Sequence, residues 1–369
     1  MIFIDCISIS ENMNLEIKIS MQDEQFMAGS AKSVITPPVS FPIFSPEFKT
    51  RKSNGILDDL LCRVVVIDIF EKKIMFISLD IWGVSDYLLT KIRKLVSKSI
   101  NISQQDIFIS ATGNATSPSI NEDEKIYRNY YNYLPEQILS ASYMATENLA
   151  PASIGSFATK LPNVSTFYEK ENYPGNPALF VTEIIGKSKN TIAKIYNFSC
   201  PANIMGEQNH NWTADFPGYS SWALEQKYGG VSIFLPAPCS DIRPYNWWKT
   251  NPNFSHSSRQ SADVQAMGLL LATQVSNFSD EVFYKRNIIT KTFEDKDNQL
   301  RILKLGDIFF VFSNKPQNNK FARRVRKKFL FSKIFVYSDN KNFTFDEKIS
   351  YDPKSVKKAQ NILQKMGAN

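Results

Sequence analysis

Few residues in this chain suit a metal centre or general-base chemistry at neutral pH. The 369 residues include only two histidines, His210 and His256, and four cysteines. The cysteines, at positions 6, 62, 200 and 239, show no CxxC spacing. A disulfide framework is not expected in a cytosolic chain of this length.

The chain also lacks long apolar runs and the common phosphate-binding and nucleophile motifs. No apolar stretch reaches the roughly 18 residues that a membrane helix needs, and the N-terminus does not have the charge and apolar pattern of a signal peptide. No Gly-x-Gly-x-x-Gly, Walker loop or Gly-x-Ser-x-Gly elbow occurs. We therefore expect a cytoplasmic protein without a transmembrane segment.

The composition is that of a folded globular protein. Hydrophobic residues make up 43% of the chain and aromatic residues 13%, which is ample for a buried core. The formal net charge of +7 is only mildly basic for this length. Such a balance does not by itself indicate nucleic-acid binding, and we expect no nucleic-acid partner.

One order of strands and helices recurs three times along the chain. β-branched and aromatic runs between Gly, Asn and Lys turns predict the strands, and apolar spacings of three to four residues predict the helices. The first copy has strands at 63–70, 74–80 and 106–110 and helices at 87–98 and 135–148. The second has strands at 180–185, 191–200 and 231–235 and helices at 218–227 and 262–276. The third has strands at 300–305, 308–313 and 333–337 and helices at 320–328 and 353–366.

These copies predict a single α/β domain, with mixed α and β layers, built from diverged strand-strand-helix-strand-helix units. We assign residues 1–26 to an N-terminal extension, 27–345 to the domain and 346–369 to a C-terminal helix packed on it. Loops that follow the strands are expected to gather on one face, where α/β folds place their sites.

A set of short landmarks occurs in a fixed order along the chain. They are Ala28–Pro38, Asn54–Leu60, Ile77–Gly83, Ala111-Thr112 with Ser117-Pro118, Asn197–Pro201, Ala214–Tyr219 and Asp241–Pro244. The ordered set resembles the N-terminal catalytic domain of neutral/alkaline (non-lysosomal) ceramidases, over about residues 27 to 345. That resemblance implies zinc-dependent hydrolysis of an N-acyl sphingoid base, in which zinc polarises the amide carbonyl and activates a bound water.

The zinc ligands that the resemblance implies are substituted in this chain. The family uses histidines in an Ala-Thr-His-Thr-His-Ser-Gly-Pro loop and a Cys-His-Pro turn, a glutamate and a late tyrosine. Gly113, Ala115 and Pro201 stand at the histidine positions, while 313–317 has no glutamate and 339–343 no tyrosine. Glycine, alanine and proline side chains offer zinc no donor atom. We therefore expect no zinc cofactor, and whether the chain is an enzyme stays open.

Several polar residues in the site-side loops are candidates for a rebuilt site. Asp80, His210, Asp215 and Asp241 are candidate catalytic residues, with structural alternatives for each: Asp215 as a helix cap, Asp241 as a partner of Arg243. Another metal site formed by His210, Asp241 and the cysteines at 200 and 239 is a further alternative.

Cations and aromatic residues in the same loops suggest ligand binding. Arg243 and Lys315 replace residues that are functional in the family, and two cations in place of a metal suit a carboxylate or phosphate. Salt bridges with nearby carboxylates are the alternative for both. The other candidate ligand-binding residues are Asn114, Thr116, Tyr245 and Trp247.

Three functions remain open from the sequence. The first is a homologue that has lost the zinc amidohydrolase site and binds a small, lipid-like or anionic ligand, an active paralogue or a second copy of itself in the old cleft. The second is a hydrolase of N-acyl or ester substrates with a rebuilt site. The third is an assembly protein that uses the aromatic loops and the basic helix near 320–328. The alternative for this helix is a charged face that contacts only solvent.

Overall fold

The protein is described by a computed structural model over most of the chain. The described residues are 26–44, 51–70, 72–118, 125–167, 175, 178–206, 209–245, 261–279, 282–297, 299–314, 317–329, 332–338 and 352–369, with 125–128 described by their backbone. The expected extension therefore lies, but for its last residue, outside the described part, as do Lys315, Trp247, His256 and the segment 339–343.

The first unit is an antiparallel three-stranded meander followed by a parallel fourth strand. Its strands run in the spatial order β1-β5-β6-β7, and β7 pairs parallel to β6 after a helical crossover. In chain order the elements are β1 (Met27–Val34), β5 (Leu61–Ile69), β6 (Lys72–Leu79), α2 (Asp86–Ile100), the 3-10 turn η1 (Gln104–Asp106), β7 (Ile107–Ala111) and α3 (Lys125–Glu147).

The second unit repeats this plan and continues the same sheet. Its elements are β8 (Ala150–Lys160), β10 (Ala178–Gly186), β11 (Thr191–Phe198), α4 (Asp215–Tyr228), β13 (Val231–Phe234) and α5 (Ser261–Ser276). A short antiparallel pairing of β1 with β8 joins the two units into one 8-stranded sheet, β13-β11-β10-β8-β1-β5-β6-β7.

The third unit forms a separate 4-stranded sheet of the same design, β15-β16-β17-β18, with β18 parallel to β17. Its elements are β15 (Thr290–Asp295), β16 (Leu300–Leu305), β17 (Ile308–Ser313), α6 (Asn319–Lys327), β18 (Lys333–Ser338) and α7 (Pro353–Lys365). Three pairs of short strands tie the connecting loops together: β2 (Pro42–Ile43) with β3 (Arg51–Lys52), β4 (Gly55–Ile56) with β12 (Asn211–Trp212), and β9 (Ser165–Phe167) with β14 (Ile242–Pro244).

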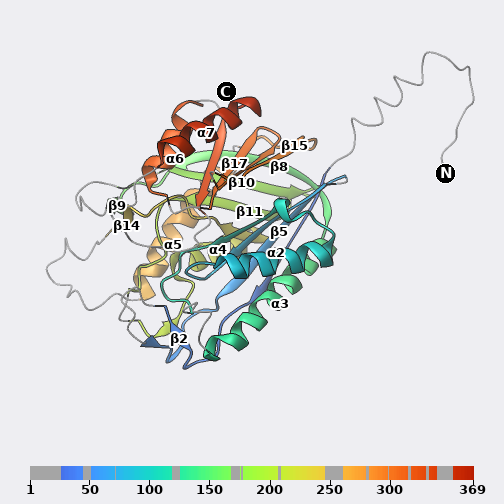
Figure 1. The fold of residues 1–369 in the computed structure, drawn as a ribbon. Helices are drawn as coiled ribbons and strands as arrows, with labels where there is room; N and C mark the ends of the chain where they lie inside the picture. The colour runs from blue at the N-terminus through green and yellow to red at the C-terminus, as the bar shows by residue number, and fades with distance from the viewer. Residues whose placement is uncertain are drawn as a thin grey trace, which may run out of the picture.

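The elements stack in four layers, helix-sheet-sheet-helix (Figure 1). One face of the large sheet is covered by α2 and α3 over its first half and by α4 and α5 over its second. Its other face packs on the small sheet through a core rich in aromatic side chains, among them Phe76, Phe108, Phe310 and Tyr337. Helices α6 and α7 cover the outer face of the small sheet. None of the helices in the described ranges combines the length and apolar character that crossing a membrane requires.

The predicted α/β class is confirmed, and each unit has one strand more than the sequence pattern indicated. The leading strands β1, β8 and β15 are the additions. β1 (MAGSAKSV) and β8 (APASIGSFATK) are made largely of small residues, and β15 (TKTFED) is a mostly exposed edge strand. None has the run of β-branched residues that marks a strand in a sequence. These segments are strands because they pair with neighbouring strands.

The sequence predicted that this helix starts at 135, but α3 begins at Lys125. Pro135 therefore lies inside the helix instead of at its start. Proline removes one backbone hydrogen bond from a helix interior. Here the helix is supported by packing: Leu134 and Ile138 are fully buried in the core between α3 and the large sheet. Packing thus overrides the local signal that placed the start at 135.

Candidate functional site

The loops that follow the strands meet at one end of the sheets, as expected. The amide of Ala115, after β7, donates to the carbonyl of Ala202, after β11, over 3.0 Å. The hydroxyl of Ser199 donates to the carbonyl of Pro238 over 2.7 Å, and Asn319 Nδ2 donates to the Ser199 hydroxyl over 2.8 Å. The first two units therefore contribute loops to this region and the third contributes the start of α6.

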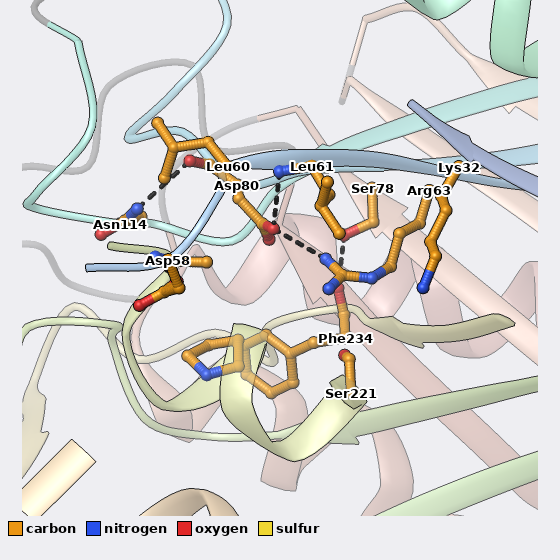
Figure 2. A network of polar contacts seen from close by, with 12 residues as sticks. Lys32, Asp58, Leu60, Leu61, Arg63, Ser78, Asp80, Asn114, Ser221 and Phe234 are labelled. Carbon is orange, nitrogen blue, oxygen red and sulfur yellow. Dashed lines mark hydrogen bonds and ion pairs between the residues drawn. The ribbon is translucent and has the colours of Figure 1, made fainter. Parts of the chain in front are cut away.

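A largely buried ion-pair network centres on Arg63 and Asp80 (Figure 2). Arg63 on β5 donates to Asp80 Oδ2 over 2.7 Å and to Glu225 Oε1 on α4 over 3.3 Å. Lys32 on β1 pairs with the second oxygen of Glu225. Burial raises the pKa of Asp80, and the charge of Arg63 partly offsets this effect. Asp80, a candidate catalytic residue, is thus held in a network that links the first and second units; a catalytic role for it stays a prediction.

Two of the predicted ligand-binding residues connect loops to one another. Asn114 Nδ2 donates to the carbonyl of Thr213 over 2.8 Å and to that of Asp80 over 3.2 Å. The Thr116 hydroxyl lies 2.7 Å from both Asn114 Oδ1 and the carbonyl of Thr213. Both side chains are fully buried, so their polar atoms serve the loop framework. A contact with a ligand stays a prediction for both.

Asp215 and Asp58 both act at the start of α4. Asp215 adopts a positive φ of 55°, which is rare for a residue with a side chain. Its carboxylate accepts from the amides of Ile204, Met205 and Phe216 over 2.7 to 3.2 Å. It thereby fixes the loop after β11 against the helix start.

Asp58 was not singled out from the sequence. Its carboxylate accepts hydrogen bonds from the Thr213 hydroxyl and from the amide of Ala214, the N-cap residue of α4. Burial of the carboxyl raises its pKa to about 6, although the two hydrogen bonds act in the opposite direction. The only signal for it in the sequence was its place in the Asn54–Leu60 landmark.

Arg51 is a second residue that the sequence did not indicate. It is buried, and its guanidinium donates to four backbone carbonyls over 2.8 to 3.1 Å. The four acceptors come from three parts of the chain and are Phe44, Ala115, Gly206 and Asn209. A fixed cation therefore cross-links the loops around Ala115. No pattern in the sequence marks such a residue, because these four acceptors are backbone atoms.

The residues that the sequence resemblance places at metal-ligand positions do not fit zinc. Gly113, Ala115 and Pro201 have no donor side chain, and the backbone of Ala115 is bonded to Ala202 and Arg51. In the described part of the chain, no three His, Cys, Asp or Glu residues are grouped closely enough to hold a metal ion.

The alternative metal set is also not assembled. His210 is exposed, and its Nδ1 lies 3.1 Å from the carbonyl of Lys52. Cys200 and Cys239 are buried, and burial raises the pKa of both thiols well above the ordinary value. Burial therefore favours the neutral thiol over the thiolate that binds metals.

A cavity of about 680 Å³ lies beside these loops, between α6 and the β9–β14 pair. It is lined by Phe167, Ala178, Asp241 and Asn319 together with the basic side chains Lys320, Arg323, Arg324, Arg326 and Lys327. Asp241 accepts from the Asn319 amide over 2.7 Å, so this candidate catalytic residue supports the first turn of α6. We call this space the basic cavity.

Arg326 is the most firmly held cation of the basic cavity. Its Nε donates to the carbonyl of Ile334 over 2.9 Å and its Nη2 to Asn197 Oδ1 over 3.2 Å. The guanidinium lies 4.1 Å from the centre of the Phe180 ring. Burial lowers the pKa of Arg326 to about 9, so it stays a cation at neutral pH.

The remaining candidates lie near this end of the molecule. Arg243 is in β14, two residues after the cavity-lining Asp241, and pairs with Thr166 of β9. The amide of Tyr245 donates to the carbonyl of Val164 over 3.0 Å. Ligand binding by either residue remains a prediction.

Comparison with known proteins places the fold. No family model matches the chain, and no curated protein matches it. The crystal structure of neutral ceramidase from Pseudomonas aeruginosa superposes with a TM-score of 0.70 at 12% sequence identity, covering 92% of this chain and 73% of that one. A ceramidase complexed with C2 gives a TM-score of 0.68 at 13% identity, covering 92% and 74%. The resemblance inferred from the sequence is therefore confirmed at the level of structure: this chain has the fold of the neutral ceramidases.

Proposed function

We propose that this chain is a cytoplasmic protein of the neutral-ceramidase fold that no longer hydrolyses amides with zinc and instead binds an anionic ligand. The observation that carries the proposal is the basic cavity, where five cationic side chains and one carboxylate of the described part of the chain line one space. Its position among the strand-end loops is where α/β folds bind ligands.

Electrostatics favour an anion in this cavity. Among the described residues, no carboxylate forms an ion pair with Arg323, Arg324, Arg326 or Lys327. Like charges this close repel one another, and an anion bound between them relieves that repulsion. Arginine forks also match the oxygens of carboxylate and phosphate groups.

Thermal stabilisation by anions tests this proposal. Inorganic phosphate, added at constant ionic strength against chloride, is expected to raise the melting temperature of the wild type, because a ligand that binds only the folded state stabilises it. The double variant Arg323→Gln/Arg324→Gln should lose most of that shift. A matched double variant on α7, Lys354→Gln/Lys357→Gln, removes the same charge away from the cavity and should keep it. Equal shifts in both variants would refute the site.

A rebuilt hydrolase is the second candidate, favoured by Asp58. This carboxyl faces the strand-end loops, and its pKa of about 6 suits a general base or acid near neutral pH. If it acts catalytically, Asp58→Asn should abolish hydrolysis of a short N-acyl or ester substrate while the far-UV circular dichroism stays unchanged. A wild type without measurable hydrolysis, or an equally active variant, rejects this candidate.

A further inference from the structure

We infer that the ligand of the basic cavity carries two or more phosphate groups, as in an oligophosphate chain or a multiply phosphorylated head group. The inference rests on the proposed anion binding and names the chemical class that the site selects. It follows from the number of cations, from their arrangement along α6 and from the fixed position of Arg326.

The number of cations exceeds what one small anion neutralises. Among the described residues that line the cavity, five are basic and one, Asp241, is a carboxylate, which accepts a hydrogen bond from the Asn319 amide. A monocarboxylate brings one negative charge, whereas Arg323, Arg324, Arg326 and Lys327 alone carry four positive charges. A phosphate group carries about −1.5 to −2 charges at pH 7 and three strong acceptor oxygens, so two or more such groups match the cavity.

The cations form a row rather than a single point. Lys320, Arg323, Arg324 and Lys327 are spaced at i, i+3, i+4 and i+7, which places them on one face of α6. At 1.5 Å per residue the row extends over about 10 Å. The apolar residues Phe321 and Val325 take the other side of the helix and are fully buried against the small sheet. An extended string of anionic groups fits such a row better than a compact anion.

Arg326 supplies a fixed point beside this row. Its contacts with Ile334, Asn197 and the Phe180 ring hold the guanidinium plane at the cavity wall. A guanidinium held in one orientation loses little freedom when it binds phosphate oxygens. Phe167 adds an apolar wall, against which an organic part of the ligand would pack.

Titration calorimetry at constant ionic strength tests the class of ligand. The probes are inorganic phosphate, tripolyphosphate and citrate, the last a polycarboxylate of comparable charge. We expect tripolyphosphate to bind at least about 10-fold more tightly than either of the others, because several phosphate groups contact the row at once. Arg323→Gln/Arg324→Gln should weaken tripolyphosphate binding by a similar factor, and Lys354→Gln/Lys357→Gln should not.

The outcomes separate this inference from the proposed function. If phosphate, citrate and tripolyphosphate bind equally well in the cavity, the anion site stands and the oligophosphate class is wrong. If none binds, or if the α7 control variant weakens binding as much as the α6 variant, both are wrong. Arg326→Lys keeps the charge but removes the fork, and an unchanged tripolyphosphate affinity in that variant would contradict the role given to Arg326.

A second experiment distinguishes a lipid head group from a soluble ligand as the molecule that carries the phosphate groups. Phosphatidylcholine vesicles with and without phosphatidylinositol bisphosphate are sedimented with the protein. Binding that requires the bisphosphate lipid and is displaced by tripolyphosphate supports the inference with a lipid head group as ligand. Tight tripolyphosphate binding in solution without vesicle binding supports it with a soluble ligand.

Discussion

Arg51 shows how a single residue holds the site-side loops together. Its guanidinium is buried and satisfies carbonyls in the loops near 44, 115 and 206–209. This buried cation therefore cross-links three separate loops of the site.

Replacing Arg51 tests that role. Arg51→Met leaves buried carbonyls without donors, each costing about 1–3 kcal/mol, so the free energy of unfolding should fall by at least about 3 kcal/mol. Lys52→Met, the same replacement at the exposed neighbour in β3, should change it by less than about 0.5 kcal/mol. Urea denaturation measures both. A loss below about 1 kcal/mol for Arg51→Met would contradict a cross-linking role.

Asp58 gives a prediction for pH dependence. Its pKa rises from 3.8 to about 6 on folding, so the ionised form is less favourable in the folded chain. The stability that it contributes is complete below the unfolded pKa and is lost as the pH rises through the folded one. Relative to Asp58→Asn, the wild type should therefore lose melting temperature between about pH 4 and pH 7. Parallel profiles of the two proteins would show that the pKa is not raised.

Polar residues of the site could be placed from the sequence, but their partners could not. Asp80, Asp215 and Asp241 follow or precede predicted elements, which fixed their position at the strand-end loops. Asp241 bonds to residue 319 in the third unit, and Asp215 bonds across the loop after β11 to residues 204 and 205. Asp58 bonds to Thr213 and Ala214, and Arg51 bonds to carbonyls of three separate loops, so neither set of partners could be predicted from the sequence.

At the scale of elements, the leading strand of each unit shows where sequence patterns fail. β1 lies between β5 and β8 in the centre of the large sheet, yet it consists mostly of small and polar residues. Small residues are needed there because α3 crosses β1 closely. A Cβ atom on Gly29 would lie 2.1 Å from the carbonyl oxygen of Ala145.

Gly29→Ala is therefore expected to be costly although alanine is a small addition. The contacting atom is backbone, so α3 must shift, and such overpacking typically costs about 1–3 kcal/mol or more. Ser33→Ala in the same strand, which removes one hydroxyl bonded to the carbonyl of Gln137, should cost no more than about 1.5 kcal/mol. Thermal unfolding compares the two variants. Equal losses would mean that α3 does not pack on β1 this closely.

At the scale of the whole molecule, the three-unit architecture was largely predictable. Helices and strands with strong periodicity lie within a few residues of their predicted bounds, as β16, β17 and α7 illustrate. How the units combine was not predictable: two share one sheet and the third stacks on it. That choice depends on the short β1–β8 pairing and on the aromatic core between the sheets, which join residues far apart in the chain.

The Arg63 network joins the first two units and should matter for global stability. Arg63→Met leaves Asp80 and Glu225 buried without their shared cation, and breaking such a pair costs about 3–5 kcal/mol. Ser78→Ala, which removes a neutral hydrogen bond to the carbonyl of Phe234 nearby, should cost about 1 kcal/mol. Denaturant unfolding followed by fluorescence gives both values. Similar costs would show that the charges are not jointly stabilised.

We propose that this chain, which has the neutral-ceramidase fold, binds no zinc at the positions that the sequence resemblance implies. The most direct test is elemental analysis of untagged protein purified without added zinc or chelator. We predict far less than one zinc per chain, because Gly113, Ala115 and Pro201 supply no ligand. About one zinc per chain, retained through gel filtration, would contradict the claim and require a metal site built from other residues.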